Sequence, residues 1–78
     1  MGVAKTFGLV LREMRIESGM TQEQLGLEAD LRRTFISLLE LGQQQPTLTT
    51  LMKISQALKC PAHQIVAKFE VCFLGNNN

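Results

Sequence analysis

Apolar residues recur at intervals of three and four along most of this chain, which is the spacing of one face of an α-helix. No stretch alternates between apolar and polar residues for long enough to form a β-strand. The pattern therefore predicts an all-α protein whose apolar stripes form the core of a helical bundle. The expected stripes are Phe7, Leu11 and Met14; Leu25 and Ala29; and Leu48, Leu51, Ile54 and Leu58.

Glycine, proline and capping residues divide the chain into five expected helices. Gly19 and Gly42 suit the left-handed position that follows a helix. Thr21 followed three residues later by Gln24 matches a capping box, and Pro61 fits a first helical turn, where its missing N–H costs nothing. We expect helices over about residues 3–18, 21–29, 33–41, 48–59 and 61–71.

The length of 78 residues indicates one domain, which we place over residues 1–78 with a core of about 5–69. Residues 75–78 are expected to form a frayed tail. A domain of this size is marginally stable alone, so a dimer interface would help it. The net charge of +1 does not by itself point to nucleic acid, so the functional argument rests on the pattern of residues.

Enzymatic and metal-binding classes lack their necessary parts. His63 is the only histidine, and no glycine-rich phosphate loop, paired carboxylate site or metal-ligand spacing surrounds it. Cys60 and Cys72 match neither a zinc motif nor a disulfide scaffold, so we interpret them as reduced thiols of a cytoplasmic protein. No apolar run reaches the roughly 18 residues that span a bilayer. We therefore expect no enzyme activity, cofactor, metal, small-molecule substrate or membrane contact.

Two short helices joined by a tight turn, over residues 21–41, are the most informative feature. The order of residue types around them resembles the helix-turn-helix family of phage repressors, Cro-type proteins and xenobiotic-response-element-like regulators. The resemblance covers about residues 5–69. It implies a compact five-helix, lambda-repressor-like domain that binds specific DNA and regulates transcription. The matching positions are Arg15, Gly19, Met20, Thr21, Gln22, Glu23, Leu25, Ala29, Leu31, Ile36, Ser37, Leu39, Glu40, Gly42, Pro46, Thr47 and Leu48.

Within this family, residues 31–37 and the Pro61-Ala62 pair are similar to the controller proteins of restriction–modification systems. The resemblance also implies roles for three polar residues. Gln22 would contact a DNA phosphate, and Arg15 and Glu40 would form a structural ion pair.

In a helix-turn-helix the third helix of this chain would enter the major groove, and the second would lie across the DNA backbone. Leu31, Ile36 and Leu39 would then face inward. Arg32 and Arg33 lie nearest the end that reaches the bases, where an arginine can make a bidentate contact to guanine. The candidate DNA-binding residues are Gln22, Arg32, Arg33, Thr34, Phe35, Ser37, Leu38, Gln43 and Gln44.

The chain departs from the family pattern in several places. Residues 21–46 carry two arginines against four acidic residues, a net charge of −2, so attraction to phosphate should be weak. Gly26 replaces a usual alanine, which costs up to roughly 1 kcal/mol of helix propensity but permits close packing. Lys59 stands where a capping glycine is usual.

Leu38 and Leu41 are apolar where relatives are usually polar. With residues 71–74 they leave open an alternative, in which the same bundle is a protein-interaction module that does not bind DNA.

A homodimer on a palindromic site is expected, because one helix-turn-helix reads too few base pairs to be specific. The last expected helix carries more apolar side chains than one small core can bury, and relatives often pair through this helix. The predicted interface consists of Ile65, Val66, Phe69, Val71 and Phe73.

Overall fold

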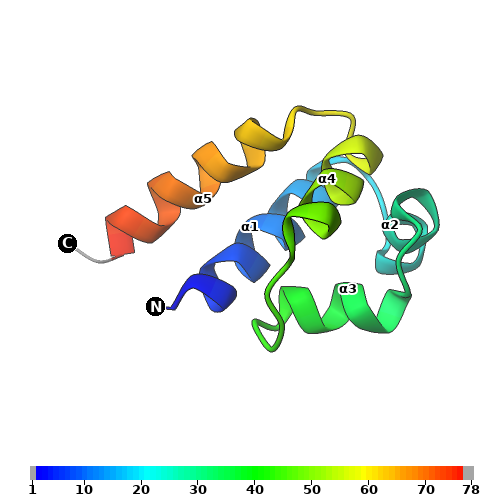
Figure 1. Ribbon diagram of the computed structural model, residues 1–78, viewed down its shortest axis with the longest axis horizontal. Coiled ribbons are helices and arrows are strands. Elements are labelled where there is room, and N and C mark those ends of the chain that lie inside the picture. The colour runs from blue at the N-terminus through cyan, green and yellow to red at the C-terminus, as the bar shows by residue number, and fades with distance from the viewer. Residues whose placement is uncertain (1, 77–78) are drawn as a thin grey trace.

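The computed structural model describes residues 2–76, and these form five helices with no strand (Figure 1). This confirms the predicted all-α, five-helix architecture. The helices are α1 (Val3–Glu17), α2 (Gln22–Ala29), α3 (Arg33–Glu40), α4 (Leu48–Ala57) and α5 (Ala62–Asn76).

Side-chain caps begin α2 and α4 where the sequence predicts them. The Thr21 hydroxyl accepts from the backbone N–H of Gln24 at 3.0 Å, and the Gln24 side chain accepts from the backbone N–H of Thr21 at 2.8 Å. This reciprocal pair satisfies two of the backbone donors that the start of α2 leaves unpaired. Thr47 likewise accepts from the backbone N–H of Thr50 and begins α4. Lys59, at φ +58°, adopts the left-handed conformation that a glycine would adopt without strain.

All five helices contribute to one core. Leu48, however, is 75% exposed, so its place in the predicted core stripe is wrong. It begins α4 six residues before Ile54, which places it about 120° around the helix from that buried side chain. The fully buried apolar side chains are Leu11 of α1, Leu25 of α2, Ile36 and Leu39 of α3, Ile54 of α4 and Ile65 of α5.

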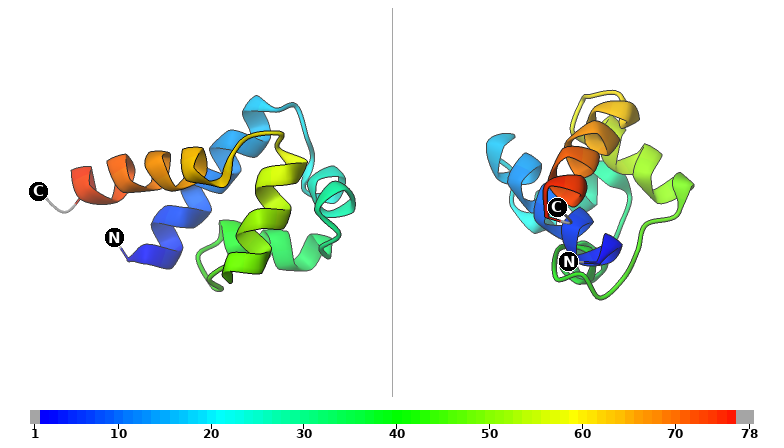
Figure 2. Two further views of the ribbon diagram at one scale, coloured as in Figure 1. Left: turned by 45° about the horizontal axis from the view of Figure 1, so that its top comes forward. Right: turned by 90° about the vertical axis from the view of Figure 1, so that its left-hand side faces the viewer.

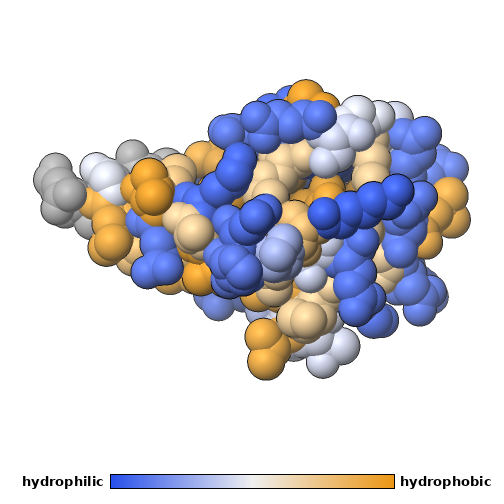
Figure 3. Space-filling model, turned by 90° about the horizontal axis from the view of Figure 1, so that it is seen from above, coloured by the Kyte–Doolittle hydropathy of each residue, from blue (hydrophilic) through white to orange (hydrophobic). Residues whose placement is uncertain are grey.

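The helices pack so that α3 lies at one edge of the molecule (Figure 1). α1 contacts both α3 and α5, while α2 contacts α3 and α4, and α4 contacts α5. The last turns of α5 extend beyond the other helices, as the left view of Figure 2 shows. The space-filling view shows apolar side chains exposed at this narrow end (Figure 3).

α5 is longer than the sequence predicts. It begins at Ala62, directly after Pro61, and continues past Val71 to Asn76, so Gly75 belongs to the helix and not to a frayed tail. Asn77 and Asn78 lie outside the described residues. The extension is explained by packing, because the rings of Phe69 and Phe73 stack one turn apart with their centroids 5.3 Å from each other.

Gly26 is required by the turn between α2 and α3. The backbone N–H of Leu31 donates to the carbonyl of Gly26 at 2.8 Å, which folds the turn back onto α2. A Cβ atom on Gly26 would lie 2.6 Å from the carbonyl oxygen of Leu31. The close packing that a glycine permits is therefore present at this position.

Gly26→Ala should lower the free energy of unfolding by about 1–3 kcal/mol, because the overpacking outweighs the helix propensity gained. Gly75→Ala is the control, since a Cβ placed there meets no described atom within 4 Å outside its chain neighbours and the backbone of its own helix. Urea denaturation of both variants measures the difference. A Gly26→Ala protein as stable as the unsubstituted chain would show that the turn relaxes at no cost.

Candidate nucleic-acid interface

A buried ion pair joins the end of α1 to the end of α3. Arg15 Nε donates to Glu40 Oε2 at 2.6 Å, and Arg15 Nη2 donates to Glu40 Oε1 at 3.1 Å. The two side chains are only 11% and 3% exposed, respectively. The hydrogen bonds from the guanidinium to Glu40 raise the pKa of Arg15 above its ordinary value, so the arginine stays charged. These are the two residues for which the family resemblance implied a pair.

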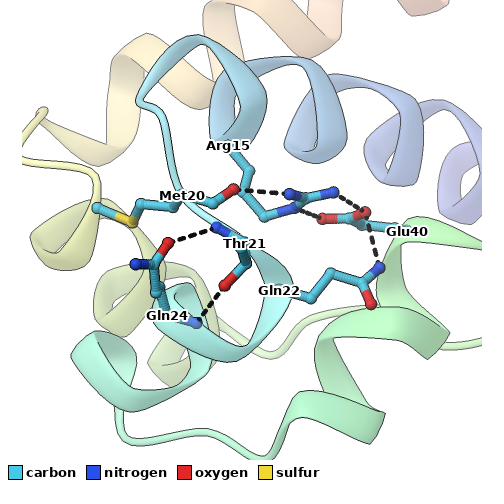
Figure 4. Close-up of polar contacts among 6 residues, drawn as sticks. All are labelled: Arg15, Met20, Thr21, Gln22, Gln24 and Glu40. Atoms are coloured by element: carbon cyan, nitrogen blue, oxygen red, sulfur yellow. Dashed lines mark hydrogen bonds and ion pairs between the residues drawn. The ribbon is translucent and has the colours of Figure 1, made fainter.

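The same cluster also includes the start of α2 (Figure 4). Arg15 Nη1 donates to the carbonyl of Met20 at 2.7 Å, just before the capping residue of α2. Gln22 Nε2 donates to Glu40 Oε1 at 3.1 Å. Gln22, for which the resemblance implies a phosphate contact, is half-buried and directs one of its N–H groups toward Glu40. Three helices are therefore joined by the side chains of Arg15, Gln22 and Glu40.

Gly8 adds a direct backbone contact between α1 and the end of α3. A Cβ atom there would lie 2.6 Å from the carbonyl oxygen of Glu40, and it would also collide with the carbonyl oxygen of Leu39. Reasoning from the sequence did not identify this residue. The available signal was a glycine in the middle of a helix beside the apolar stripe of Phe7 and Leu11, where an alanine would favour the helix by about 1 kcal/mol.

One face of α3 points outward. Arg33 and Thr34 are exposed, and Ser37 and Leu38 are half-buried, one turn further along the helix. Residues four apart lie on the same side of a helix, so these four side chains share one face. Arg32 is exposed at the N-cap position beside them.

Three further candidate DNA-binding residues lie away from the outward face of α3. Phe35 is half-buried and packs against the hydrophobic core, so it lies apart from the outward face on which it was expected. Gln43 and Gln44 are exposed in the loop that follows α3.

The negative charge of residues 21–46 is largely offset by helices outside that segment. Arg15 compensates Glu40, and Lys53 Nζ lies 4.0 Å from Asp30 Oδ2. Adding these two positive charges to the net −2 of the segment gives zero. The surface around α3 therefore does not repel phosphate as strongly as the composition of the segment suggests, and Arg32 and Arg33 are exposed on it.

The predicted dimer residues do not form one surface. Ile65 has no exposed area and belongs to the core, so its assignment to an interface is wrong. Val66 is 39% exposed and lines a hollow of about 220 Å³ together with Phe69. Val71 follows Val66 by five residues, about 140° around α5, and lines a different hollow between α1 and α5. The remaining lining of the first hollow is Val3, Phe7, Gln45, Pro46, Leu51 and Ile65.

Neither a metal-binding cluster nor a membrane-spanning helix is found in residues 2–76. No group of three histidine, cysteine or acidic side chains in this part of the chain is arranged to hold a metal ion. None of its helices has both the length and the apolar character needed to cross a membrane.

Comparison with known proteins gives a consistent family. The sequence model of the family described as helix-turn-helix matches residues 11–65. The control protein C.BamHI of Bacillus amyloliquefaciens is 45% identical over 53 residues, which cover 67% of this chain and 65% of that protein. The match thus spans just under two thirds of the length of that relative.

Solved structures of similar proteins share the fold. The restriction–modification controller protein C.AhdI from Aeromonas hydrophila is 31% identical, with a TM-score of 0.77 over 80% of this chain and 94% of that one. The restriction–modification controller protein C.Esp1396I is 27% identical, with a TM-score of 0.86 over 95% of this chain and 97% of that one. These relatives are regulators by name and not enzymes.

Glu40→Ala should lower the free energy of unfolding by about 3 kcal/mol or more, because it leaves the Arg15 guanidinium buried without its partner. The matched control is Glu17→Ala, which removes an exposed carboxylate 3.7 Å from Lys68 and should cost less than about 1 kcal/mol. Thermal and urea unfolding measure both. Equal, small losses in the two variants would contradict a structural role for the pair.

Proposed function

The chain belongs to the helix-turn-helix family of DNA-binding transcriptional regulators, and from this premise we propose that it acts as a homodimer on a palindromic operator, which it reads in the major groove with α3. The observation that carries the proposal is the outward face of α3. The hydrogen bonds among Arg15, Gln22 and Glu40 fix the position of α3 relative to α1 and α2.

Base reading is assigned to the outward face of α3. Arg33 is exposed in the first turn, the end of a recognition helix that approaches the base edges. Its guanidinium suits the two acceptors of guanine, and Thr34 and Ser37 beside it can bond to a base or a phosphate. Leu38 on the same face offers an apolar contact to a thymine methyl group.

Backbone binding is assigned to the start of α2. The capping box already satisfies the N–H groups of Thr21 and Gln24, and the N–H of Leu25 donates to the carbonyl of Thr21. The N–H groups of Gln22 and Glu23 precede the first intrahelical bond, so they remain for an external acceptor. A phosphate placed at this helix end would also gain from the helix dipole.

A role as a restriction–modification controller is proposed on similarity. Two solved relatives carry that description, and C.BamHI is called a control protein. Residues 31–37 and the Pro61-Ala62 pair are the stretches of this chain that resemble such proteins.

The dimer interface is proposed on the Val66 side of α5. Val66 and Phe69 line the hollow described above, and Leu51 of α4 lines it from the other side. Leu48 and Met52, close to Leu51 on α4, are exposed apolar residues. An apolar surface that stays partly exposed on the described residues is typical of an association site. A two-fold axis through it would pair the same residues of both copies and present two α3 helices to one face of the DNA.

Arg33→Ala should lower specific affinity about tenfold or more and relax the base preference at one position of each half-site. Arg12→Ala is the matched control, because it removes the same exposed charge from α1. Sites selected from a random DNA pool, followed by competition gel shifts, measure both effects. Full specificity in Arg33→Ala would show that α3 does not read the bases. Absence of any duplex binding by the unsubstituted chain at low salt would instead favour the protein-interaction alternative.

Val66→Glu should weaken the dimer at least tenfold, since it places a charge in a desolvated interface. Val71→Glu on the far side of α5 is the control and should leave association unchanged. Sedimentation equilibrium at about micromolar concentration measures both. A monomeric unsubstituted chain would contradict the homodimer, and dissociation by Val71→Glu alone would move the interface to the groove between α1 and α5.

A further inference from the structure

The Gln22 side chain is held in one orientation by Glu40. Its nitrogen Nε2 donates to Glu40 Oε1 at 3.1 Å, and the whole residue is half-buried. Figure 4 shows the amide with its nitrogen toward the carboxylate and its oxygen turned away. The bond joins the first residue of α2 to the last residue of α3, 18 positions apart in the chain.

The chemistry of a carboxylate explains this orientation. An ionised carboxylate only accepts hydrogen bonds, so it attracts the nitrogen end of an amide and repels the carbonyl end. The carboxylate itself has little freedom to turn, because Arg15 donates to both of its oxygens. The nitrogen of Gln22 carries two hydrogens, and the bond to Glu40 uses one of them.

Gln24 shows that this orientation is not a general property of α2. It lies two residues further along the same helix and is exposed. There the carbonyl oxygen is the engaged end, because it accepts from the backbone N–H of Thr21 at 2.8 Å. The two glutamines therefore use opposite ends of the same amide group, and the neighbouring group decides which end is used.

We infer that Glu40 is a positioning residue for DNA binding. It fixes the Gln22 amide so that the second N–H of Nε2 remains for a backbone phosphate, and it keeps the carbonyl oxygen from turning toward that phosphate. This inference rests on the proposed DNA-binding function. It assigns to the buried ion pair a second role besides stability, namely to select the one amide orientation that contributes a donor to a phosphate contact.

A double-mutant cycle on DNA binding tests the coupling. The proteins are the unsubstituted chain, Gln22→Met, Glu40→Gln and the double variant, and fluorescence anisotropy measures their affinity for a generic duplex at low salt. Gln22→Met should weaken binding about fivefold when Glu40 is present, the size of one lost hydrogen bond. In the Glu40→Gln background the same change should cost less than about twofold, because the amide is no longer oriented.

The outcomes of the cycle are distinct. Equal effects of Gln22→Met in both backgrounds would overturn the positioning role of Glu40 while leaving DNA binding intact. An unsubstituted chain that binds no duplex would instead overturn the proposed function. Gln24→Met is the control, and its effect should be the same with either residue at position 40. Circular dichroism establishes that each variant is folded at the assay temperature.

If Glu40→Gln does not fold, NMR of the unsubstituted chain tests the same inference. The side-chain NH₂ signals of Gln22 are identified by their absence in Gln22→Met. One proton should be protected from solvent exchange in the free protein, and the other should shift when duplex DNA is added. Exchange of both protons at the rate of the Gln24 pair would overturn the inference. The inference would also be overturned if the duplex binds but the signal of the second Gln22 proton does not shift.

Discussion

The carboxylate of Glu40 is buried at the end of α3, and a buried charge must be compensated inside the protein. Each compensating group comes from a different place in the chain. Arg15 reaches it from α1, and Gln22 reaches it from α2, while Arg15 also holds the carbonyl of Met20 ahead of α2. One desolvated charge therefore draws three helices together at one point, where α3 contacts α1 and α2.

Backbone contacts at both ends of α3 complement this cluster. At the start, Gly26 allows the turn to fold back onto α2, and at the end, Gly8 allows α1 to approach the last carbonyl groups. Gly42, at φ +77°, then turns the chain away beside Lys5. Side chains at these glycines would push α3 outward, so α3 is held by contacts that have little room to adjust. A helix held in this way loses little conformational freedom when it binds a partner, which favours affinity.

The helix-turn-helix segment carries little net charge once Arg15 and Lys53 are counted, and this bears on the proposed function. Arg15 and Lys53 offset the acidic residues of the helix-turn-helix segment but leave few cations beyond Arg32 and Arg33. Phosphate attraction then supplies less of the affinity than in a strongly basic domain. In the proposed dimer, binding of two half-sites would restore the lost affinity, and the apolar hollow beside Val66 would connect the two copies.

The sequence by itself determined the number of helices, their order and the family, though not the full length of α5. Periodicity, the Thr21 capping box and the glycines after helices act over a few residues, so they can be interpreted without knowing the rest of the fold. The pairing of Arg15 with Glu40 came instead from the family resemblance, whose residue pattern keeps its register over most of the chain.

Only the tertiary structure decided how side chains are shared between helices. It buried Ile65, exposed Leu48, separated Val71 from Val66, turned Gln22 toward Glu40 and revealed the contact at Gly8. Each of these depends on where a helix distant in the sequence comes to lie. A helical stripe gives the direction of its own apolar face, but the width of that face and the group opposite each residue are set by the neighbouring helices. Burial and pairing are properties of two surfaces in contact, and a single chain segment specifies only one of them.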